Sequence, residues 1–139
     1  MREQILAAVE TLCGTVEGVA EVERMPSGDP ASFPALHIFD QGDEPAQEEE
    51  ETDTEAFWLQ IGIDGYVTES PASTAANALY AALKEILMAH PPIGGIAEEI
   101  RQGRLDMAVA ERAKDHRLGF GVEFNILYRT RFGRPQEIG

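Results

Sequence analysis

The sequence predicts an α+β fold, a largely antiparallel sheet of about four to five strands with two helices packed on one face. Three observations predict it. Two long segments alternate apolar and polar residues, two others repeat apolar residues every three or four positions, and shorter extended segments lie between turn-forming residues. An antiparallel sheet covered on one side accounts for this alternation, because its apolar face packs on helices while its other face stays more polar.

Length and composition indicate one globular domain over residues 1–139. A chain of 139 residues with 43% hydrophobic residues can bury a substantial core, and no repeat of the 20 to 50 residue kind divides it. The single cysteine, Cys13, excludes an intramolecular disulfide and favours a reducing cytoplasm.

Two helices follow from apolar periodicity. Ile5, Val9 and Leu12 recur along one side of residues 5–13, and Gly14 follows as a C-terminal stop. The second helix is expected over residues 70–89, where Ser70 and Pro71 suit a helix start and an alanine-rich stripe follows.

Strands are predicted between and after the helices. The two clearest segments, residues 57–67 and 118–129, alternate apolar and polar residues almost without a break. Residues 19–24 and 35–40 read as short strands, and residues 96–105 fit either a strand or a short helix, with a strand favoured.

Two segments are predicted to lack regular structure. Residues 41–55 hold eight acidic and no basic residues, eight of the 14 net negative charges, so a solvated loop between strands is expected. Residues 131–139 read as a flexible tail.

The residues that carry chemistry are not arranged for catalysis, cofactor binding or metal binding. His37, His90 and His116 have no pair at metal-ligand spacing, and Cys13 lies beside an apolar stripe, where a buried, inert thiol is expected. The acidic pairs of residues 41–55 sit in a predicted loop that would not hold them on a substrate. The glycines near residue 94 lack the lysine of a phosphate-binding loop. We therefore expect no enzyme.

Charge and hydropathy also bear on partners. A net charge of −14 disfavours nucleic acid, because phosphates repel it. The first residues include charges where a signal peptide needs an apolar run, and no later run is long and apolar enough to span a membrane, so neither export nor a membrane partner is expected.

Self-association is the function that the remaining features favour. Arginines collect near the end of the last long strand, and large side chains occur on its less covered face and that of its predicted neighbour. Cover by a loop or by the first helix would explain the large side chains equally well. The candidate subunit-interface residues are Trp58, Tyr66, Glu123, Leu127, Arg129, Arg131 and Arg134.

Five segments together resemble the tail terminator and tail completion proteins of long-tailed phages and prophages, the group that includes minor tail protein U. The resemblance runs over nearly the whole chain, and it rests on order and spacing more than on any one motif. The segments are residues 3–13 (EQILAAVETLC), 18–22 (GVAEV), 33–40 (FPALHIFD), 77–83 (NALYAAL) and 121–130 (GVEFNILYRT).

The resemblance implies a structural protein with no cofactor. Such proteins form a ring, usually a homohexamer, that caps the tail tube, stops its polymerisation and takes part in head-tail joining. The implied partners are further copies of the chain, the major tail tube protein and a head-completion or neck protein, first in the host cytoplasm and then in the virion tail. A neck or head-completion (connector) protein is the alternative within assembly. An acidic adaptor or inhibitor that mimics nucleic acid through residues 41–55 is the alternative from another class.

Overall fold

The structure is a computed structural model that describes residues 1–46, 53–68, 72–107 and 118–138. Its elements follow one another as α1 (Arg2–Gly14), β1 (Glu21–Arg24), β2 (Ala35–Pro45), β3 (Thr54–Tyr66), α2 (Ala72–Leu87), the 3₁₀ turn η1 (Pro92–Gly95), β4 (Glu99–Met107), β5 (Leu118–Arg131) and β6 (Arg134–Ile138). In the described part of the chain, no helix is both long and apolar enough to cross a membrane.

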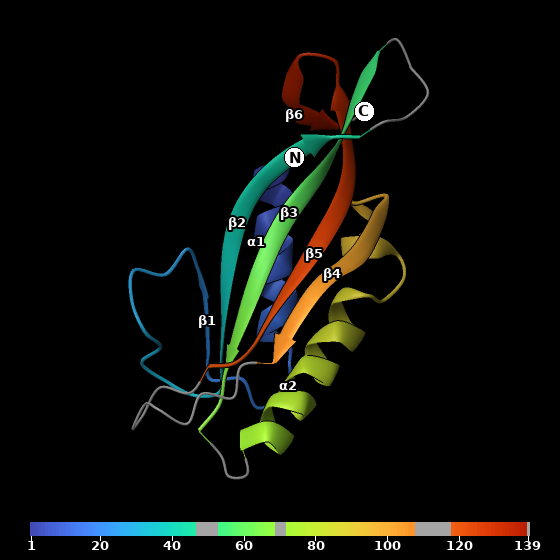
Figure 1. Ribbon diagram of the computed structural model, residues 1–139. Coiled ribbons are helices and arrows are strands. Elements are labelled where there is room, and N and C mark those ends of the chain that lie inside the picture. The colour runs from blue at the N-terminus through green and yellow to red at the C-terminus, as the bar shows by residue number, and fades with distance from the viewer. Residues whose placement is uncertain (47–52, 69–71, 108–117, 139) are drawn as a thin grey trace.

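The strands form one curved sheet in the order β1-β2-β3-β5-β4, with β6 paired to β5 (Figure 1). Each of these pairs is antiparallel except β1 with β2, which is parallel. The prediction of an α+β fold with a largely antiparallel sheet is confirmed. Residues 96–105 were predicted as a strand, with a short helix as the alternative, and most of them belong to strand β4, which lies at an edge of the sheet beside β5.

The core forms where alternate residues of the long strands meet the helices. Ile61 of β3 is in register with Phe124 of β5, and Ile63 with Val122, which places these apolar side chains on one face. Val9 of α1 and Leu83 of α2, both fully buried, belong to the same cluster of buried residues. Both helices therefore cover one face, as the periodicity predicts.

The acidic segment 41–55 differs from its prediction as a loop. Strand β2 continues to Pro45 and strand β3 begins at Thr54, so both ends of the segment are paired strand, with Pro45 opposite Phe57. Ladder hydrogen bonds and partners for the carboxylate of Asp43 stabilise these extended ends, although a run of acids alone disfavours structure. Residues 47–52 lie outside the described part of the chain.

The prediction of a flexible tail over residues 131–139 is also corrected for residues 131–138, and residue 139 lies outside the described part of the chain. Arg131 ends β5, Gly133 adopts a left-handed φ of 71°, and β6 turns back to pair Arg131 with Arg134 and Thr130 with Ile138. Glycine takes this conformation without steric cost, so Phe132 and Gly133 make a tight turn. We call residues 130–138 the β5–β6 hairpin; it projects past the end of the sheet in Figure 1.

Candidate functional site: an interaction surface

The sheet face turned away from the helices carries most of the predicted interface residues. We call it the open face and define it by Trp58 and Tyr66 of β3 with Glu123, Leu127 and Arg129 of β5. Strand alternation places these side chains opposite the core positions, and Trp58 lies in register with Leu127. Their role in subunit contacts stays a prediction.

Parts of the open face are covered within the subunit. The guanidinium of Arg101, from the edge strand β4, lies 4.8 Å from the centre of the Trp58 ring in a cation–π contact. Leu127 is only 7% exposed. A shallow hollow of about 250 Å³ remains beside Trp58, lined also by Glu44, Gln60, Arg101 and Asn125. The Trp58 side chain is therefore half-buried, and the residues that line the hollow beside it are polar.

The three predicted arginines fall into two groups. Arg129 donates from Nε to Glu98 Oε1 (3.2 Å) and from Nη1 to Thr54 Oγ1 (3.0 Å), so it links β5 to β3 and to the residue that precedes β4 inside the subunit. Arg131 and Arg134 both reach the carboxylate of Glu137, and about two thirds of each side chain is exposed. Of the three predicted arginines, Arg131 and Arg134 are therefore the two more accessible to a partner.

The β5–β6 hairpin also presents apolar side chains that sequence reasoning missed. Phe132 is 67% exposed and Ile138 is 64% exposed. Among the described residues, these two are the most exposed of five exposed large hydrophobic side chains, the others being Met25, Met88 and Met107. The sequence does show an aromatic residue between Arg131 and Arg134. Because this segment was predicted to be a flexible tail, no position could be assigned to that side chain.

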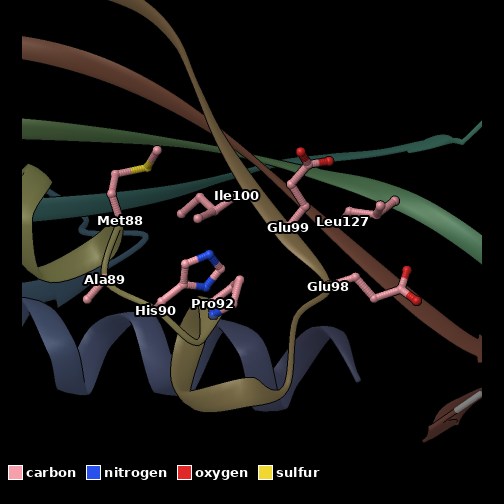
Figure 2. Close-up of a pocket in the computed structure, with 8 residues that line it drawn as sticks. All are labelled: Met88, Ala89, His90, Pro92, Glu98, Glu99, Ile100 and Leu127. Atoms are coloured by element: carbon pink, nitrogen blue, oxygen red, sulfur yellow. The ribbon is translucent and has the colours of Figure 1, made fainter.

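A cavity of about 430 Å³ lies at the connection that runs from α2 through η1 to β4 (Figure 2). We call it the α2–β4 cavity. Its apolar wall includes Met88 and Ile100, and its polar wall includes His90 and two carboxylates. The residues that line it are Met88, Ala89, His90, Pro92, Glu98, Glu99, Ile100 and Leu127. Its size is within the range of binding pockets, roughly 300–1,000 Å³.

Two polar clusters occur elsewhere, and each holds elements together. His37, only 1% exposed, places Nε2 2.7 Å from Glu21 Oε2, while Glu21 Oε1 accepts the backbone N–H groups of Ala31 and Ser32. The bond to His37 lowers the pKa of Glu21. The carboxylate of Glu23 approaches closely enough for these three side chains to hold a cation together, all ligand atoms being within 4.8 Å. The Glu21 bonds explain the cluster without a cation, because they tie β1 to β2 and to the segment that joins them.

The second cluster ties α1 to the sheet. Arg2 donates from Nη2 to Asp40 Oδ1 (2.6 Å) and from Nε to Asp43 Oδ2 (3.0 Å), and the hydroxyl of Tyr128 donates to the same Asp43 oxygen (2.6 Å). The bond from Arg2 lowers the pKa of Asp40, while burial and then Asp43 raise the pKa of Tyr128. One oxygen of Asp43, Oδ2, therefore accepts hydrogen bonds from both α1 and β5.

Cys13 has the environment that the sequence predicts for it. It is fully buried in the core, and burial, with a smaller effect of Glu10, raises the pKa of its thiol to about 12. The reactive form of cysteine is the thiolate, which is scarce at neutral pH when the pKa is so high. Cys13 is therefore no nucleophile.

Comparisons with known proteins give little further guidance. No family model matches the chain, and no curated protein matches it. Among solved structures, the gp17 protein of bacteriophage SPP1 is similar with a TM-score of 0.45 at 16% identity, over 90% of this chain and 86% of that chain. A likeness of this extent carries no argument about function.

Proposed function

We propose that this protein is a structural subunit of a phage or prophage tail, a tail terminator that caps the tail tube and stops its polymerisation. It acts without a cofactor and catalyses no reaction. Its partners are further copies of itself in a ring, the major tail tube protein, and the neck protein to which the finished tail is joined. It works in the host cytoplasm during assembly and stays in the virion tail.

The observation that carries the proposal is the β5–β6 hairpin. Exposed aromatic and aliphatic side chains beside arginines are typical of protein contact surfaces and unfavourable on a protein with no partner. Phe132, Ile138, Arg131 and Arg134 are all exposed on this one projecting element. The resemblance of five ordered segments to tail terminators then indicates which kind of assembly the contact serves.

The alternative of an acidic nucleic-acid mimic has less support. Such a mimic needs the carboxylates of residues 41–55 displayed to a partner, whereas Asp43 of this segment is bound by Arg2 and Tyr128. A neck protein remains the alternative within assembly, and the partner it binds distinguishes it from a terminator.

Tube growth provides the test. The major tail tube protein of the same phage is polymerised alone and with increasing amounts of this protein, and tube lengths are measured by negative-stain electron microscopy. We expect shorter tubes with extra density at one end. Unchanged tubes in the presence of excess folded protein would contradict the terminator function, and binding to isolated heads under those conditions would favour the neck protein.

A further inference from the structure

The α2–β4 cavity and the β5–β6 hairpin have complementary properties. The hairpin presents one large exposed aromatic side chain, Phe132, between two exposed arginines. The cavity offers apolar surface mainly from Met88, which is 36% exposed, because Ile100 is only 8% exposed, and two half-exposed carboxylates, Glu98 and Glu99, also line it. An aromatic anchor that enters an apolar pocket with charges at its rim is the usual centre of a protein interface.

Charge favours contact at this place over others on the molecule. With a net charge of −14, two copies repel each other over most of their surfaces. The hairpin is an exception, because residues 131–138 hold Arg131 and Arg134 against Glu137 alone. Glu98 and Glu99 already contact Arg129 and Arg101 within the subunit, but nearly half of each glutamate side chain is exposed, so each can also meet an incoming arginine.

The hairpin and the cavity lie on the same edge of β5, because Glu99 at the start of β4 pairs with Leu127 and Ile138 of β6 pairs with Thr130. Phe132 nevertheless does not fill the cavity of its own subunit, since it is 67% exposed and is not among the residues that line the cavity. A second copy can therefore supply the aromatic side chain that occupies it. Contacts between two different patches are heterologous, and they build a closed ring when the rotation between copies closes.

We propose that Phe132 of one copy inserts into the α2–β4 cavity of the next, with Arg131 and Arg134 facing Glu98 and Glu99 across the contact. This inference rests on the proposed function, since it names the interface through which the ring forms. Each subunit carries one anchor and one cavity, so in a closed ring every copy gives one Phe132 and receives another.

Complementation between two variants tests a heterologous contact directly. Phe132→Asp removes the anchor and leaves the cavity intact, while Met88→Asp puts a charge in the cavity and leaves the anchor intact. The control is Met25→Asp, which changes another exposed methionine, 58% accessible and outside both features. Circular dichroism establishes that each variant is folded, and analytical ultracentrifugation over a range of concentrations gives its association.

We expect wild type and Met25→Asp to associate equally, and each of the other two variants to associate roughly 30-fold or more weakly, the change typical of a central interface residue. Mixed in equal amounts, Phe132→Asp and Met88→Asp should form a one-to-one dimer and nothing larger, because only one intact anchor and one intact cavity can meet. Phe132→Ala should weaken association in the same direction.

Three results would overturn the inference. Association of the wild type without recovery of a dimer in the mixture would exclude this contact and leave the proposed function standing. Equal weakening by Met25→Asp would show that the effect is not local. A wild type that stays monomeric at the highest concentration would also reject the contact, and tube length would then decide separately whether the protein is a terminator.

Discussion

At the scale of single residues, two glycines set how closely the sheet approaches its neighbours. A Cβ atom on Gly65 would overlap the ring of Phe120, its partner across β3 and β5. A Cβ atom on Gly119 would lie 2.8 Å from the Cβ of Ala76 on α2. Both positions therefore require the smallest side chain for packing, because a core this dense has no room for an added methyl group.

Replacement of Gly65 tests this packing. Gly65→Ala forces the buried Phe120 ring to move, so the free energy of unfolding should fall by about 1–3 kcal/mol or more. Gly28→Ala is the matched control, since no atom lies within 4 Å of its added Cβ, and it should change stability by less than about 1 kcal/mol. Urea unfolding at pH 7 measures both. Equal stabilities for the two variants would show that the Phe120 ring relaxes without cost.

Individual residues also show where sequence reasoning reaches its limit. Alternation correctly places Trp58 and Leu127 opposite the core, because side chains of a strand point to its two faces in turn. The partner of Arg129 could not be predicted from the sequence, because Glu98 lies 31 residues away in the chain and comes near only through the pairing of β4 with β5. Phe132 was missed because exposure depends on the turn of a hairpin that no periodicity indicates.

At the scale of elements, α1 is fixed to the sheet by one charged network in addition to its apolar stripe. Arg2, at the start of the helix, bonds Asp40 and Asp43 of β2, and Asp43 bonds Tyr128 of β5. The two Arg2 bonds carry a charge on both partners and the Tyr128 bond on one, and hydrogen bonds with a charged partner are the stronger class. The network holds the helix across the strands at the end of the sheet where β6 also pairs.

Removal of the arginine should loosen this attachment in a pH-dependent way. Arg2→Met leaves two carboxylates without their cation, and the free energy of unfolding should fall by about 1–3 kcal/mol at pH 7. Arg2 lowers the pKa of Asp40 from its usual 3.8. A lowered pKa in the folded state gives stability that is present above pH 3.8 and lost as pH falls further, so the difference between wild type and variant should shrink below that pH.

Urea unfolding from pH 7 to pH 3 measures this difference. The matched control is Arg104→Met, whose partner Asp106 and own side chain are both largely exposed, so the loss should be within about 0.5 kcal/mol at every pH. A difference between wild type and Arg2→Met that stays constant down to pH 3 would mean that Arg2 acts through packing of its stem and not through its charge.

Elements with strong periodicity were predictable and their ends were not. The long strands β3 and β5 and the helix α2 match their predicted segments because one face of each is apolar along its length. Strand β2 continues past its predicted end to Pro45, and β6 forms where no strand was predicted. Each of the two pairs with a neighbouring strand of the sheet. Local composition, acidic in the first case and rich in glycine and proline in the second, opposes a strand that tertiary contacts nevertheless favour.

At the scale of the whole molecule, the order of strands is the feature that sequence could not supply. Strand β5 lies between β3 and β4, so the last long strand of the chain occupies an interior position in the sheet. The parallel pairing of β1 with β2 is equally invisible in the pattern of either strand. Both depend on contacts between distant segments, whereas the prediction of two helices on one face needed only the apolar face of the sheet.

The folded subunit carries a large excess of negative charge. The chain carries 25 acidic and 11 basic residues, and several of its ion pairs, such as Arg101 with Glu99 and Arg104 with Asp106, are largely exposed. Exposed pairs contribute little stability, roughly 0–1 kcal/mol each. Repulsion among the remaining acids should therefore dominate the electrostatic free energy of the folded subunit at pH 7.

Salt should consequently stabilise the subunit. When NaCl rises from 10 to 150 mM, the Debye length falls from about 30 Å to about 8 Å, which screens repulsion between carboxylates on different parts of the surface. If screening relieves about 1 kcal/mol, the Tm at pH 7 should rise by roughly 3–5 °C in dilute protein. At pH 4.5, close to the isoelectric point of the sequence, the same salt step should move the Tm far less, because the net charge is then near zero. Thermal unfolding followed by circular dichroism gives both values. A Tm that falls with salt at pH 7 would show instead that attraction within ion pairs outweighs repulsion across the molecule, and the acidic surface would then stabilise the subunit.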